Sequence, residues 1–398
     1  MWCRSLGFLA VCCAAFSAAR LRAAERASGR QEAFFRAREH RTEYAGPGRE
    51  DVAPATVDEI RIGYFGPGDP ADPEGGDLWC AAQLALDEAN AAGGYHGKPF
   101  RLVAAWSENP WGTGVAQVAR MVYREKVWAI VGGIDGPSTH LAEQVVVKSR
   151  LTLLGPASTD KTANLANVPW MFSLLPGDHL GAPVLAGAIE SIGKGPLVLV
   201  SADDHDSRHF TSELEKGLSL RHLVPQYHFQ CRQGMADLDP LVERVLRPGP
   251  AAIVIAAGAN DSARLVKAVR EGGFSGTVLG GPSIARKSFS EQAKAAAEGV
   301  VFPLVWDPQD GFGEFEREFR ARFDRPPDYA AAQTYDAVRL LVAAIRKAGL
   351  NRARIRDAVE QISPWTGVAG TITWDALGAN TRAVRLGVIR DGRPVAPP

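Results

Sequence analysis

The residues of this chain best suited to chemistry form the cluster "DDHD" at Asp203 to Asp206. The cluster follows the apolar run "PLVLVS", which places it at the carboxyl end of a predicted strand, where open α/β sheets bind ligands. Carboxylates beside an imidazole suit metal binding, acid–base catalysis or contact with a polar ligand. No second cluster at a suitable spacing completes a metal site. Ligand contact through Asp204 and Asp206 and a solvated loop therefore remain the two main interpretations.

A second candidate is the glycine-rich turn "GGIDGPST", from Gly132 to Thr139. A dinucleotide loop needs the spacing G-x-G-x-x-G, and a P-loop ends in Gly-Lys-Ser/Thr. The turn has neither feature, and Asp135 would repel a phosphate. The chain also lacks the G-x-S-x-G and H-E-x-x-H motifs of common hydrolases. These motifs therefore give no support for a nucleotide site or a hydrolase.

The turns "GIDGPST" and "GPASTD" follow consecutive predicted strands and begin predicted helices. Helix N-termini expose unpaired N–H groups and attract negative charge. Ser138, Thr139, Ser158 and Thr159 add hydroxyl groups. Together the turns would form a pocket for a carboxylate or amide oxygen. The alternative is helix capping by Ser138 and Thr159, which requires no ligand.

The elements that position these turns alternate between strand and helix. The strand "IRIGYF" is followed by the helix "DLWCAAQLALDEAN", and short connections continue the pattern. Such alternation predicts parallel sheets with helices on both faces. Two successive α/β units share the chain, with candidate crossovers near 172–177 and 299–309. The closing stretch 367–394 is expected to form a hairpin.

The N-terminus has the pattern of an export signal over residues 1–24, with Arg4 before the apolar core "LGFLAVCCAAF". A flexible leader is expected over 25–57. Lipid attachment at Cys12 or Cys13 is the less favoured alternative, because Val11 precedes Cys12. Cys80 and Cys231, the two cysteines outside the signal, are expected to be free thiols.

The 398 residues carry equal numbers of acidic and basic side chains, so the formal net charge is zero. A nucleic-acid partner would normally require a basic surface. The composition likewise gives no support for binding to a strongly anionic membrane surface, and we expect no membrane span after signal cleavage.

From residue 58 to the C-terminus, the chain resembles the type I periplasmic solute-binding proteins of ABC transporters, in the leucine/isoleucine/valine-binding branch. The stretches that carry the resemblance are "IRIGYFGP", "ALDEANAAGGYHGKPFRLV", "VWAIVGGIDGPSTHLAEQVV", "LTLLGPASTDKT" and "GTITWDALGANTR". The resemblance implies an α/β fold of two Rossmann-like lobes joined by a three-strand hinge. Lobe 1 would comprise 58–173 and 307–367, and lobe 2 would comprise 174–306 and 368–398.

The resemblance also implies where a solute would bind. In this family the turns at Gly136 to Ser138 and Ala157 to Thr159 meet the ligand carboxylate, and the Ala157 carbonyl faces an ammonium. This chain departs from the family by having Asp206 where an aromatic residue is usual and Ser283 where an acidic residue is usual. Asp135 or Asp206 would then be the ammonium partner. The expected contact residues are Trp79, Asp135, Gly136, Ser138, Ala157, Ser158, Thr159, Asp204, Asp206 and Ser283.

These expectations describe an exported, periplasmic receptor. It would capture a small polar organic solute, such as an amino acid, an amide or a related carboxylate, and deliver it to an ABC permease with its ATPase subunits. We expect a monomer that needs no metal or cofactor and performs no catalysis. Two alternatives remain: a ligand sensor of the same fold, with the leader serving a protein partner, and an enzyme that uses Asp203 to Asp206.

Overall fold

The computed structural model describes residues 44, 46–107, 109–166, 168–193, 195–307 and 311–397. The chain divides into two units, 1–43 and 44–398, and the description below concerns the second. The predicted signal peptide and the first part of the predicted leader lie outside the described residues. Among the described helices, none combines the length and the apolar character needed to cross a membrane.

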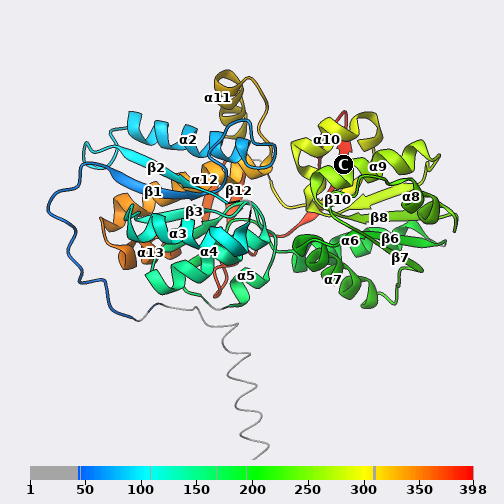
Figure 1. The fold of residues 1–398 in the computed structure, drawn as a ribbon, viewed down its shortest axis with the longest axis horizontal. Helices are drawn as coiled ribbons and strands as arrows, with labels where there is room; N and C mark the ends of the chain where they lie inside the picture. Colours follow the sequence, from blue (N-terminus) through cyan, green and yellow to red (C-terminus); the bar gives the residue numbers. More distant parts are fainter. Residues whose placement is uncertain are drawn as a thin grey trace, which may run out of the picture. The chain divides into compact units, whose positions relative to one another are not determined.

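The first lobe is built on a five-stranded parallel sheet in the order β2-β1-β3-β4-β5 (Figure 1). Its strands are β1 (Ile60–Phe65), β2 (Phe100–Ala105), β3 (Ala129–Gly132), β4 (Thr152–Gly155) and β5 (Met171–Ser173). Its helices are α2 (Gly76–Ala91), α3 (Val115–Tyr123), α4 (Gly136–Ser149), α5 (Thr162–Leu165), α11 (Phe312–Phe323), α12 (Tyr329–Ala348) and α13 (Arg352–Gln361). A short π-helix, η1 (Pro110–Gly114), precedes α3, and the hairpin β11 (Trp365–Gly367) and β12 (Gly370–Ile372) joins this lobe through α12.

The second lobe is built on a seven-stranded sheet in the order β14-β13-β10-β9-β8-β6-β7. Its strands are β6 (Leu197–Ala202), β7 (Tyr227–Cys231), β8 (Ala252–Ala256), β9 (Thr277–Gly280), β10 (Val301–Leu304), β13 (Arg385–Arg390) and β14 (Arg393–Val395). Its helices are α6 (Asp178–Ile192), α7 (His205–Ser219), α8 (Asp239–Leu246), α9 (Ala259–Glu271) and α10 (Lys287–Ala293), with two 3₁₀ turns, η2 (Pro282–Ala285) and η3 (Lys294–Ala297). The edge strands β13 and β14 are antiparallel, whereas β6 to β10 are parallel.

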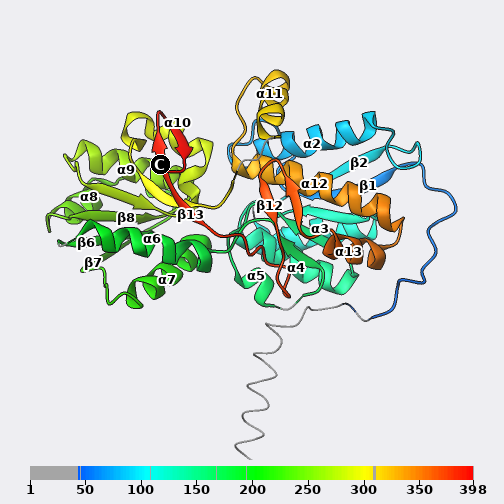
Figure 2. The same ribbon diagram turned by 180° about the vertical axis from the view of Figure 1, so that it is seen from behind.

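Apolar strands buried on both faces explain why these sheets form. In β1, Ile60, Ile62 and Tyr64 pack in the cluster that contains α2 and α12. Phe65 points to the other face and packs with α3 and α4. The second sheet divides in the same way, with α6 and α7 on one face and α8 and α9 on the other (Figure 2). The predicted α/β class with two Rossmann-like lobes is confirmed.

Three crossovers join the lobes, after β5, after β10 and after β12, and side chains of the third tie them together. The Trp374 indole N–H donates to the Ser173 carbonyl at 2.9 Å. The Asn380 amide donates to the Leu174 carbonyl at 2.6 Å. Arg382 donates to the carbonyls of Val305 and Ala369. Burial lowers the pKa of Arg382 to about 10. These buried polar links define the hinge.

Two parts of the chain differ from the sequence expectation. The stretch 367–394 does not form one hairpin: it completes the β11–β12 pair and then crosses to the second sheet as β13 and β14. The second half of the predicted flexible leader is anchored to α13. There, Asn351 donates to the carbonyls of Gly48 and Asp51, and Arg49 forms an ion pair with Asp357. Cys80 and Cys231 are free and buried, as expected.

The hinge links predict a measurable stability cost. Replacing Asn380, which is 1% exposed, by alanine leaves the Leu174 carbonyl buried without this donor. We expect Asn380→Ala to lower the free energy of unfolding by about 1–3 kcal/mol, measured by urea denaturation. The adjacent exposed residue gives the control: Thr381→Ala should change it by less than about 0.5 kcal/mol. Equal effects of the two variants would contradict the stabilising role of Asn380 in the hinge.

Candidate functional site

A cleft of about 550 Å³ lies between the carboxyl ends of the two sheets. Carboxylates dominate its charged lining, with Arg286 and His205 the basic side chains. The acidic residues are Glu74, Asp135, Asp204, Asp206 and Asp261. Among the expected contact residues, Asp135, Ala157, Asp204, Asp206 and Ser283 line this cleft. A volume of this size suits a small organic molecule.

The turn after β3 is built around the start of α4. Asp135 is the N-cap: its Oδ1 atom accepts the Ser138 N–H at 2.8 Å and also contacts the Ser138 hydroxyl. The Ser138 hydroxyl in turn accepts the N–H of Ile134 at 3.0 Å. Ser138 is fully buried and completes a capping box, so its role here is local. The Asp135 Oδ2 atom has no hydrogen-bond partner among the described residues.

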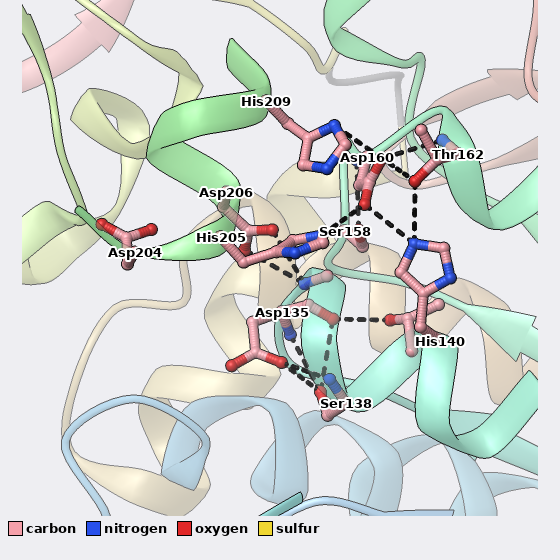
Figure 3. Close-up of polar contacts among 12 residues, drawn as sticks. Asp135, Ser138, His140, Ser158, Asp160, Thr162, Asp204, His205, Asp206 and His209 are labelled. Atoms are coloured by element: carbon pink, nitrogen blue, oxygen red, sulfur yellow. Dashed lines mark hydrogen bonds and ion pairs between the residues drawn. The ribbon is translucent and has the colours of Figure 1, made fainter. Parts of the chain in front are cut away.

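Asp206 reaches across from the second lobe to the first turn of α4 (Figure 3). Its two carboxylate oxygens lie 3.0 and 3.2 Å from the Gly136 N–H. Burial raises the pKa of Asp206 to about 7; the Gly136 N–H opposes this rise, and the nearby Asp135 carboxylate adds to it. A Cβ atom on Gly136 would lie 2.1 Å from Asp206 Oδ1. A side chain at position 136 would therefore displace the Asp206 carboxylate from this contact.

The acidic residues of "DDHD" have separate structural partners. Asp204 is the N-cap of α7 and accepts the Ser207 N–H at 2.9 Å. Asp203 accepts the Gln233 N–H at 2.8 Å. The helix thus begins at His205, so the residues for which a solvated loop was one interpretation form the cap and the first turn of α7.

Five expected residues lie elsewhere or serve local structure. The Ser158 hydroxyl accepts the Asp160 N–H at 3.1 Å. The Thr159 carbonyl accepts the Asp178 N–H at 2.8 Å. Trp79 packs against Tyr64, with ring centroids 5.1 Å apart. These three residues are not among the residues that line the cleft, and neither are Ser138 and Gly136.

A polar group contributed by both lobes contains functional residues that were not expected from the sequence. Arg286 of the second lobe pairs with Asp328 of the first at 2.6 Å and donates to the Glu74 carbonyl at 2.8 Å. Burial alone would raise the pKa of Asp328, but the Arg286 charge holds it below its usual value. The Glu74 carboxylate accepts from the Asn260 amide at 2.6 Å, and burial raises its pKa. Single charged residues so far apart in the sequence form no motif that could have identified them.

A third group joins the lobes around Asp160. His140 Nε2 and His205 Nε2 lie 2.9 and 2.7 Å from Asp160 Oδ2. Hydrogen bonds to Asp160 and Glu143 raise the pKa of His140 to about 9. Burial would raise the pKa of Asp160, but hydrogen bonds from His140, Thr162 and His205 hold it well below its usual value.

Comparison with known proteins shows which family has this architecture. A family model described as a periplasmic binding protein matches residues 59–393. An amino acid binding protein of Pseudomonas aeruginosa is 24% identical over 327 residues, which cover 80% of this chain and 87% of the relative.

Solved structures share the fold. The branched-chain amino acid transporter substrate-binding protein LivJ of Streptococcus pneumoniae, in complex with isoleucine, has a TM-score of 0.77 and 22% identity, covering 85% of this chain and 100% of LivJ. A solute-binding protein of an ABC transporter from Rhodopseudomonas palustris, in complex with benzoate, has a TM-score of 0.75 and 14% identity. That match covers 85% of this chain and 95% of the other.

The capping role of Asp204 can be tested separately from ligand binding. We expect Asp204→Ala to lower the free energy of unfolding by about 1 kcal/mol, because the first-turn N–H groups of α7 lose their acceptor. Asp204→Asn keeps a capping oxygen and should remain close to the wild type. Chemical denaturation measures both variants. An alanine variant as stable as the asparagine variant would contradict the assignment of Asp204 as the cap.

Proposed function

Because the chain belongs to the periplasmic binding protein family, we propose that it captures a small organic solute with a cationic amino group and delivers it to an ABC permease. The solute is an amine, an amide or an amino acid that carries such a group, and it binds in the cleft between the lobes. Residues 1–24 direct export to the periplasm, and a single receptor chain meets the permease and its ATPase subunits.

One observation carries the choice of solute: the Asp206 carboxylate already lies on the N-terminal N–H of α4. That N–H is the position at which a helix attracts an anion. A solute that entered as a plain carboxylate would compete with Asp206 for the same donor and would meet Asp135 beside it. An ammonium group would instead be attracted to both carboxylates.

The charges around the cleft support the same choice. Among the described residues, five carboxylates and one arginine line it. That arginine, Arg286, is already paired with Asp328. Mutual repulsion of these acids falls when a cation lies among them, because opposite charges within a few ångströms stabilise each other in a partly dry site. The Asp135 Oδ2 atom accepts no hydrogen bond from any described residue, so it is available as an acceptor for the solute.

Delivery to a permease rests on the family and on the two-lobed architecture. Periplasmic binding proteins close around their ligands by a hinge motion. In this chain the three crossovers provide such a hinge, and polar contacts between the lobes provide surfaces that meet on closure. The names of the matching proteins from S. pneumoniae and R. palustris include transport, which supports the same role.

A thermal-shift screen of the untagged mature chain tests the proposal. The screen pairs each amine or cationic amino acid with a carboxylic acid of similar size that lacks the amino group. We expect amino-bearing compounds to raise the melting temperature, because ligand at 100 times its Kd adds about 2.7 kcal/mol of stability. Stabilisation by the carboxylic acids alone would overturn the solute class. Absence of binding by any small molecule would overturn the receptor function.

A matched pair of variants then locates the amino group. Asp135→Asn keeps an oxygen for the α4 cap and removes the charge. We expect it to weaken binding of the identified solute by about 10–100-fold, as for loss of a charged hydrogen bond, measured by calorimetry. Asp237→Asn changes an exposed acid outside the cleft lining and should leave the affinity unchanged. Equal affinities of both variants would remove Asp135 from the site.

A further inference from the structure

A cluster of histidines and carboxylates lies beside the cleft, where α4 and the turn after β4 meet α7. In Figure 3, His140 and His205 approach Asp160 from different helices. The Asp160 Oδ2 atom lies 2.9 Å from His140 Nε2 and 2.7 Å from His205 Nε2. The three atoms, two imidazole nitrogens and one carboxylate oxygen, all lie within 4.8 Å of one another.

We propose that this cluster binds one divalent transition-metal ion, with zinc as the best fit, through His140 Nε2, Asp160 Oδ2 and His205 Nε2. Imidazole and carboxylate are common zinc ligands, and sites with three protein ligands leave a fourth position open. Zinc ligands lie about 2.0–2.1 Å from the ion in a tetrahedron, which separates them by about 3.3 Å. The nitrogen–oxygen distances therefore need to widen by only about 0.5 Å to admit the ion.

The groups behind two of these side chains, Asp160 and His140, hold them in the orientation that a metal requires. The other oxygen of Asp160, Oδ1, accepts the Thr162 N–H at 2.8 Å and its hydroxyl at 2.7 Å. The Nδ1 atom of His140 lies 3.4 Å from Glu143 Oε2. A carboxylate behind a ligating imidazole fixes the tautomer in which Nε2 is available to the metal. The metal would replace the present contact of His140 Nε2 with the Thr162 hydroxyl, 2.8 Å away.

The charge of the cluster favours a dication. The Asp160 and Glu143 side chains are 1% and 5% exposed, and burial of unpaired carboxylates is costly. Among the described residues their ion-pair partners are all histidines. Glu143 Oε1 is also buried with no hydrogen-bond partner in the described structure. An ion of charge two would balance both carboxylates while the histidines remained neutral ligands.

The ligands come from both lobes, which gives the ion a structural consequence. His140 and Asp160 belong to the first lobe, whereas His205 lies in the first turn of α7 in the second. His209, one turn further along α7, has its Nδ1 atom 3.7 Å from Asp160 Oδ1. Opening at the hinge would separate His205 from the other two ligands. Metal binding therefore favours the arrangement in which the lobes meet.

Calorimetric titration of zinc chloride into the untagged, EDTA-dialysed mature chain tests the site. We expect one ion per chain. His140→Asn and His205→Asn should each weaken binding by at least about 100-fold, and Glu143→Gln, which acts through His140, by about tenfold. His222→Asn is the matched control: this histidine is exposed and has φ of 57°, a conformation that asparagine tolerates. It should leave the affinity unchanged.

Two outcomes overturn the site: no stoichiometric binding, or binding that is as tight in His140→Asn and His205→Asn as in His222→Asn. Thermal unfolding without metal checks that each variant is folded. Cobalt(II) provides a readout on the unaltered chain, because bound tetrahedral cobalt gives visible absorption bands that the hydrated ion lacks. Bands that appear up to one equivalent support the site, whereas the spectrum of hydrated cobalt contradicts it.

Discussion

The Asp206 carboxylate on the first N–H of α4 is the contact on which the rest of the site depends. It places a negative group at the positive end of a helix, where it is stabilised. It joins the two lobes and requires glycine at position 136, since a Cβ atom there would collide with the carboxylate. It also fills the position at which an external anion would bind. Asp206 and Asp135 are two of the five carboxylates that give the cleft its acidic character.

The hinge and the contacts between the lobes have different physical characters. The crossovers are tied by buried hydrogen bonds from Trp374, Asn380 and Arg382, which are costly to leave unmade. The contacts across the cleft, such as Glu74 with Asn260, are polar pairs that water can replace when the lobes separate. The crossovers stay linked while water replaces the polar contacts across the cleft. This combination allows the lobes to separate and meet without unfolding.

The local sequence predicted the alternating strands and helices, because a few consecutive residues determine each buried strand and the turn that follows it. The resemblance to solute-binding proteins, and not the strand pattern, placed Asp135 and Asp206 in one cleft, because the strands before them belong to different sheets. The local sequence failed where partners come from opposite lobes: Arg286 with Asp328, and His140 with His205, meet only through the tertiary fold. His205 and His209 are four residues apart, so they lie on one face of a helix only if α7 begins at His205. That start was not predicted, because Asp204 was not interpreted as the cap of α7.

Native mass spectrometry of the chain, purified without denaturation from the cells that naturally produce it, tests the central claim most directly, because a solute held between closed lobes can survive purification. The account predicts a bound small molecule in a one-to-one complex whose fragments contain a basic nitrogen, and its release on unfolding. A bound carboxylic acid with no basic nitrogen would contradict the account, since such a molecule would have to displace Asp206 from the α4 terminus.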